Sequence, residues 1–125
     1  MKRIVNGDSL QFKDEKDNIV AELIEKRTGK DIWSVYIKGT INNDCAYDIS
    51  DELFALISAE NGIILDMSET TYVSSTFAEM LVQLQIKMEN TDFESMPIQN
   101  MPPEIFRSLK EKGCIMSLDY ELKED

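Results

Sequence analysis

Hydrophobic and polar positions in the first forty residues follow the pattern of extended strands. Short extended pieces are predicted within 3–12, and 32–37 is rich in β-branched and aromatic residues. Residues 19–24 suit either a strand or a short helix, and we favour a strand. Asn6-Gly7 is typical of a tight hairpin turn and divides the first segment in two. A turn is expected at 28–31, and Gly39 is expected to end the third strand. We therefore predict N-terminal strands, with residues 1–17 as a strand extension.

The second half of the chain alternates between helical and strand patterns. Apolar residues spaced by three and four positions predict one helix over 46–57 and a second that begins near Ser74. Pro102-Pro103 opens a third helix, which Gly113 ends. The predicted core positions of these helices are Ala46, Ile49, Leu53, Leu56, Ile57, Phe77, Met80, Leu81, Leu84, Met88, Ile105, Phe106 and Leu109.

Strand patterns occur between and after these helices. Ile63-Ile64-Leu65 is aliphatic without alternation, which is typical of a strand buried on both faces. Further strands are predicted at 94–98 and 114–118, and residues 121–125 are predicted to fray. Alternating strands and helices predict an α/β fold, with a mixed β-sheet against which about three to four helices pack.

The length and composition suit one soluble domain. The 125 residues are expected to form a single domain, and their 42% hydrophobic content is enough for a core. The longest apolar runs fall far short of the roughly 20 residues that span a bilayer. Asn6-Gly7-Asp8 interrupts the N-terminal apolar residues, unlike a secretory signal. We expect a cytoplasmic protein that does not bind a membrane.

The charge of the chain narrows the class of partner. Thirteen basic residues against 24 acidic ones give a formal net charge of -11. Such a negative field repels the phosphates of nucleic acids and anionic lipids, and it favours basic partners. The same acidity would also serve simply to keep a cytoplasmic protein in solution. In either case we expect no nucleic-acid binding.

The chemistry-bearing side chains argue against catalysis. The chain has no histidine, which removes the usual general base and the commonest metal ligand. Its two cysteines, Cys45 and Cys114, are far apart and form no CxxC motif. A glycine-rich phosphate loop and a paired-carboxylate motif are also absent from the sequence. We predict that the protein is not an enzyme and holds no cofactor or metal.

One stretch of sequence carries a resemblance to a known family. After the strand Ile63-Ile64-Leu65-Asp66-Met67-Ser68, a short loop leads to Tyr72-Val73-Ser74-Ser75-Thr76 and an amphipathic helix. This arrangement resembles the STAS domain of anti-sigma factor antagonists. The spacing from Asp66 to Ser75 matches the family's spacing from its strand aspartate to its phosphorylatable serine. Segments 35–41 and 98–106 also resemble the family, so the resemblance covers roughly 18–120.

The resemblance implies a function in signalling and transcription regulation. It makes Ser75 the candidate for phosphorylation, with Thr76 and Ser74 as secondary candidates. It also implies a protein partner, an anti-sigma factor that doubles as an ATP-binding serine kinase, held by the unmodified protein and released by the phosphoprotein. The implied partner-binding residues are Asp66, Ser68, Ser74, Ser75, Thr76, Phe77 and Glu79.

The chain departs from the family pattern around the serine. Ser74 stands where the family usually has aspartate, and Phe77-Ala78-Glu79 stands where it commonly has glycine, an aliphatic residue and glycine. An alternative interpretation is that Ser75 only caps the helix, with Thr76 and Glu79 forming a capping box. The protein would then be an unswitched STAS-like adaptor or small-ligand sensor. Asp66 would hold its loop rather than contact a partner, and the oligomeric state is left open.

Overall fold

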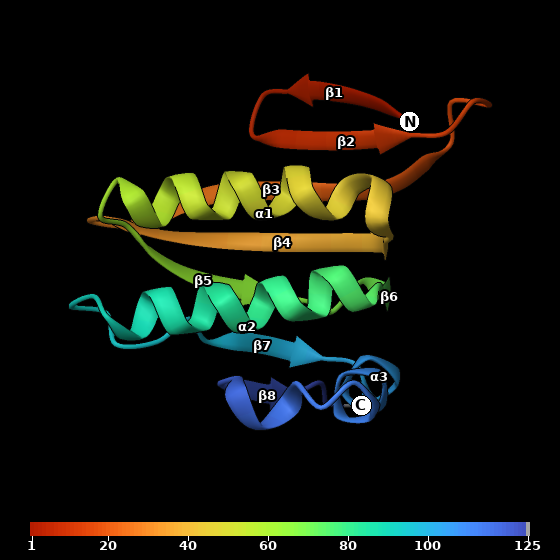
Figure 1. Ribbon diagram of the computed structural model, residues 1–125. Coiled ribbons are helices and arrows are strands. Elements are labelled where there is room, and N and C mark those ends of the chain that lie inside the picture. Colours follow the sequence, from red (N-terminus) through yellow and green to blue (C-terminus); the bar gives the residue numbers. More distant parts are fainter. Residues whose placement is uncertain (125) are drawn as a thin grey trace.

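The computed structural model describes residues 1–124 and contains one mixed sheet with three α-helices (Figure 1). The strands are β1 (Lys2–Asn6), β2 (Ser9–Lys13), β3 (Ile19–Gly29), β4 (Ile32–Ile41), β5 (Gly62–Asp66), β6 (Thr70–Val73), β7 (Ile98–Met101) and β8 (Tyr120–Leu122). The helices are α1 (Asn43–Ser58), α2 (Ser75–Glu89) and α3 (Pro103–Glu111), with a 3₁₀ turn at Ile115–Ser117. Within the described residues, no helix is both long and apolar enough to cross a membrane.

The sheet runs in the order β1-β2-β3-β4-β5-β7-β8, and β6 pairs with the end of β4. The first four strands are antiparallel, whereas β5, β6, β7 and β8 join through parallel pairs. The hairpin β1–β2 lies within residues 1–17. The α/β fold with a mixed sheet and three helices is therefore confirmed.

Helices α1 and α2 lie side by side across one face of the sheet (Figure 1). Because side chains alternate along a strand, Val35 and Ile37 of β4 are fully buried under this layer, whereas Tyr36 is half-buried on the other face. The same alternation reaches β5, where Ile63 and Leu65 are buried but Ile64 is only half-buried. The expectation that this strand is buried on both faces is therefore wrong at its middle residue.

Gly39 does not end its strand, contrary to the prediction. Its φ of +86° is in the left-handed region that glycine adopts without penalty, and β4 continues beyond it to Ile41. The register against β6 shifts between Gly39 and Thr40, and the Gly39 N–H donates to the Glu69 carbonyl at 2.9 Å. The glycine thus permits a bulge in the strand, and β6 joins β4 beside it.

The C-terminal part differs most from the prediction. β7 begins only at Ile98, after a loop where a strand over 94–98 was expected, and 114–118 contains a 3₁₀ turn rather than a strand. Residues Glu121 and Leu122 belong to β8 and do not fray. The Lys123 N–H extends this pairing by donating to the Met101 carbonyl at 2.8 Å. Asp125, the last residue of the predicted tail, lies outside the described residues.

Candidate functional site

The N-termini of all three α-helices gather at one edge of the sheet (Figure 1). β4, β6 and β7 each lead directly into a helix: α1, α2 and α3 respectively. Each helix start carries backbone N–H groups without intrahelical partners and the positive end of the helix dipole. Ligands of open α/β sheets bind outside the carboxyl ends of the strands, and this edge corresponds to that position.

Ser74, and not Ser75, caps α2. The Ser74 hydroxyl accepts a hydrogen bond from the Phe77 N–H at 3.1 Å, and its backbone is extended. Ser74 is 5% exposed, whereas Ser75 is the first helical residue and is exposed to solvent. The expectation that Ser75 caps the helix is therefore wrong, and so is the capping box of Thr76 and Glu79. The helix starts two residues earlier than that box requires.

Exchanging the two serines for alanine will separate their roles. We expect Ser74→Ala to lower the free energy of unfolding by about 1 kcal/mol, because the Phe77 N–H loses its acceptor. Ser75→Ala removes an exposed hydroxyl and is expected to change stability by less than about 0.5 kcal/mol. Urea unfolding of both variants measures the difference. Equal losses would contradict the assignment of the cap to Ser74.

Phe77 points into the core rather than toward a partner. It has no exposed surface and belongs to the main hydrophobic cluster, together with Ala78 and Leu81. A partner therefore cannot touch its ring in this structure. Glu79 is exposed and Thr76 half-buried. Of the residues expected to bind a partner, Ser74 and Phe77 are thus withdrawn from the surface.

Asp66 holds a loop together. Its carboxylate accepts hydrogen bonds from the Ser68 N–H and the Asn100 side-chain amide, each at 2.9 Å. Burial alone would raise the pKa of Asp66, but these hydrogen bonds and the nearby Lys123 ammonium outweigh it and lower that pKa. Lys123 also donates to the Ser68 carbonyl at 3.1 Å. These contacts support the interpretation of Asp66 as a loop-holding residue.

The structure does not bring Asp66 next to Ser75. Asp66 lies opposite Tyr36 on β4, whereas Val73, two residues before Ser75, lies opposite Ile41. Those two positions on β4 are five residues apart (41 − 36), which corresponds to about 16 Å along a strand. The segment from Asp66 to Ser75, whose spacing matches the family, therefore leads from the middle of β4 to its end.

Sequence reasoning missed the polar surface of β6. The segment was expected to be a loop, but Thr70–Val73 is a strand beside the end of β4. The Thr40 and Thr71 hydroxyls lie 3.3 Å apart, and Tyr72, three residues before the start of α2, is 49% exposed. The run of β-branched and aromatic residues at 70–73 was the available signal.

Other features that could hold a ligand lie elsewhere. One surface hollow of about 200 Å³ lies beside the N-terminal hairpin, and another of about 440 Å³ is lined by residues such as Glu60 and Asn90 near the ends of α1 and α2. None of the predicted site residues lines either hollow. Among residues 1–124, no group of three or more carboxylate or cysteine side chains is arranged to hold a metal ion.

Comparisons with known proteins bear on the fold. No protein-family model matches the sequence, and no curated protein matches it. An anti-sigma factor antagonist from Mycobacterium paratuberculosis has a similar structure, with a TM-score of 0.66 and 12% identity over 87% of this chain and 89% of that one.

Two further solved structures are also similar. RsbS from Moorella thermoacetica, in a serine-to-glutamate variant, has a TM-score of 0.64 and 19% identity over 82% of this chain and 87% of that one. The anti-sigma factor antagonist SpoIIAA, in its unphosphorylated form, has a TM-score of 0.61 and 9% identity over 79% and 87%. At these identities the likeness establishes the architecture: the chain has the STAS-like α/β fold of anti-sigma factor antagonists.

Proposed function

We propose that this chain is a cytoplasmic, non-catalytic regulatory module that binds a protein partner through the edge where the helices begin, and that phosphorylation of Ser75 controls this binding. The observation that carries the proposal is that two neighbouring serines have different positions: one caps the helix and the other is exposed. Ser74 is buried and caps α2, so the exposed Ser75 hydroxyl is not required for the helix. A kinase can therefore modify Ser75 without removing the cap.

The position of Ser75 suits a phosphate group. At the first position of α2, a phosphate lies at the positive end of the helix dipole, which favours the anion by about 0.3–1 kcal/mol. It adds close to two negative charges. Glu79 is exposed one turn further along α2, and the whole chain is strongly acidic. A partner fitted to the unmodified edge then meets both added bulk and added negative charge.

The solved structures with this fold support a phosphorylation switch. SpoIIAA is described in its unphosphorylated form, and RsbS in a variant that replaces serine by glutamate. By analogy, the proposed partner is an anti-sigma factor that is also a serine kinase. The analogy concerns function and is separate from the fold, because one fold hosts many functions.

Ser75→Asp is expected to lose the partner that the unmodified protein holds. In pull-downs from the native cell lysate, wild type and Ser75→Ala should retain the same protein, because both leave position 75 uncharged. Ser75→Asp should weaken its retention at least about tenfold, which corresponds to about 1.4 kcal/mol. Retained proteins are identified by mass spectrometry, and affinity is then measured with the purified partner.

The matched control is Ser117→Asp, which adds the same charge at an exposed residue of the 3₁₀ turn. It should bind like wild type. A direct assay completes the test: wild type incubated with lysate and ATP should carry phosphate at Ser75, and Ser75→Ala should carry none. If Ser75→Asp binds as tightly as Ser117→Asp, the switch is refuted.

That negative outcome would favour the unswitched adaptor. The observation that favours the adaptor is that Glu79 is exposed where the family pattern has a glycine. It therefore alters the surface one turn from Ser75. An adaptor would retain one partner in all the variants, and wild type would remain unmodified after incubation with lysate and ATP.

A further inference from the structure

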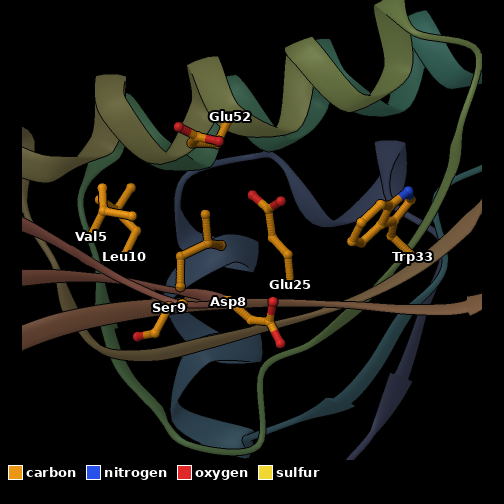
Figure 2. Close-up of a pocket in the computed structure, with 9 residues that line it drawn as sticks. Val5, Asp8, Ser9, Leu10, Glu25, Trp33 and Glu52 are labelled. Atoms are coloured by element: carbon orange, nitrogen blue, oxygen red, sulfur yellow. The ribbon is translucent and has the colours of Figure 1, made fainter.

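A groove lies between the N-terminal hairpin and helix α1, away from the edge that carries Ser75. Its volume is about 200 Å³, and apolar side chains form its walls. In Figure 2, Trp33 stands on one side of Glu25, and Val5 and Leu10 stand on the other. Val5 is 68% exposed, because the hairpin reaches beyond the helical layer (Figure 1). The groove is therefore open to solvent.

Three carboxylates line this apolar groove. Glu25 projects from β3 toward the helix that carries Glu52, and Asp8 lies in the hairpin turn (Figure 2). One cation faces them: the Arg3 guanidinium contacts Glu52 at 3.1 Å. Among the ion pairs of residues 1–124, none includes Glu25. The groove thus holds more negative charge than its own residues neutralise.

We propose that this groove receives a lysine or arginine side chain from a basic protein partner. Both side chains have an apolar stem that can pack along Val5, Leu10 and Trp33, and a cationic head that can reach the carboxylates of Glu25 and Glu52. The volume lies below the roughly 300–1,000 Å³ of typical small-molecule sites, and it matches one long side chain. The net charge of -11 attracts such a partner from a distance.

The protonation state of Glu25 provides a second test of the proposal, because it should make binding in the groove depend on pH. Burial, the neighbouring Glu52 carboxylate and then Asp8 raise the pKa of Glu25 to about 7. A cation in the groove favours the ionised carboxylate, so below this pKa binding must first release a proton. Affinity is therefore expected to rise as the pH increases from roughly 6 to 8, and to level off above that range.

Trp33 reports directly on the groove. It is the single tryptophan of the chain, and its ring forms one wall. Its indole nitrogen is buried without a hydrogen-bond partner among the described residues, and it points away from Glu25 (Figure 2). The nitrogen is thus not part of the proposed contact. The fluorescence of the ring will follow occupancy of the groove.

The test is a titration of the intact chain with a blocked peptide of alternating lysine and glycine, followed by Trp33 fluorescence at pH 8. We expect a saturable change in wild type and at least a fivefold weaker affinity in Glu25→Gln. Glu111→Gln is the matched control, because it removes the same charge from an exposed residue of α3. The same peptide with norleucine in place of lysine should produce no saturable change.

The pH series separates a specific contact from general attraction to an acidic protein. Wild type should bind more tightly at pH 8 than at pH 6, and Glu25→Gln should lose most of this difference. If Glu25→Gln and Glu111→Gln bind alike at both pH values, the groove proposal is overturned. The groove shares no residue with the edge around Ser75, so this result would leave the proposed phosphorylation switch untouched.

Discussion

Replacing Gly39 by alanine is expected to lower the free energy of unfolding by about 3 kcal/mol or more. A Cβ atom at this position would lie 2.3 Å from the Val20 carbonyl oxygen, and 3.2 Å from the Ala21 Cα atom. These are backbone atoms of β3, which the pairing of β3 with β4 holds in place. The φ of +86° adds about 1–2 kcal/mol for any residue with a side chain. Urea unfolding of the purified variant measures the loss.

Gly113→Ala is the matched control for the clash. Gly113 also has a positive φ, +74°, but nothing lies within 4 Å of a Cβ atom built there. Its replacement is therefore expected to cost only about 1 kcal/mol, from the backbone conformation alone. Similar losses in the two variants would show that β3 yields to the added atom, and would contradict the rigid bulge.

Replacing Gly39 is also expected to disturb the edge around Ser75. The Gly39 N–H donates to the Glu69 carbonyl at 2.9 Å, and two residues further along β4 the Ile41 carbonyl accepts from the Ser74 N–H at 2.8 Å. These bonds attach β6 and the first turn of α2 to the sheet. A displaced bulge would therefore also displace Ser75, although Ser75 lies far from Gly39 in the sequence.

The second large effect is expected from Phe77→Ala, at about 3–5 kcal/mol. Phe77 is completely buried, so truncation of its ring removes apolar contacts and leaves a cavity beneath the first turn of α2. Thermal or urea unfolding measures the loss, and partner binding is compared at a temperature where the variant is folded. This result would place Phe77 in the core, as its helical spacing predicted, and not on the partner-binding surface that the family resemblance implied.

Glu79→Ala is the control on the same helix. Glu79 is exposed, and we expect its replacement to change stability by less than about 0.5 kcal/mol. If Phe77→Ala proved as stable as Glu79→Ala and lost the partner, Phe77 would have to turn outward in the functional state. The buried position described above would then be wrong for the protein in solution.

The two proposed surfaces differ in the groups that line them. The edge around Ser75 is built from helix starts and is suited to a switch, because its backbone N–H groups and dipoles favour an added phosphate. The groove around Glu25 is built from the hairpin, β3, the start of β4 and the middle of α1, and it is suited to a cationic side chain. A basic partner that contacts both would respond to phosphate at one surface and to pH at the other.

Local patterns in the sequence determined most of the secondary structure and the class of fold. The Asn-Gly turn and the β-branched and aromatic residues predicted the N-terminal strands, and stripes of apolar residues predicted α1, α2 and α3, because these signals depend only on neighbouring residues. The proline pair at the start of α3 and the glycine after its end were also interpreted correctly. The composition was compatible with this architecture, and the resemblance to the family predicted the same fold.

Only the tertiary structure decided which residues face a partner. By residue type, either Ser74 or Ser75 could cap the helix. Ser74 is the cap because its N–H is bonded to the Ile41 carbonyl of β4, which places its hydroxyl next to the Phe77 N–H. The C-terminal residues form β8 because β7 lies beside them in space. Glu25 and Glu52 meet in one groove although they are 27 positions apart (52 − 25). Such contacts between distant segments leave no periodic signal in the sequence, because they arise only when the sheet and the helices pack together.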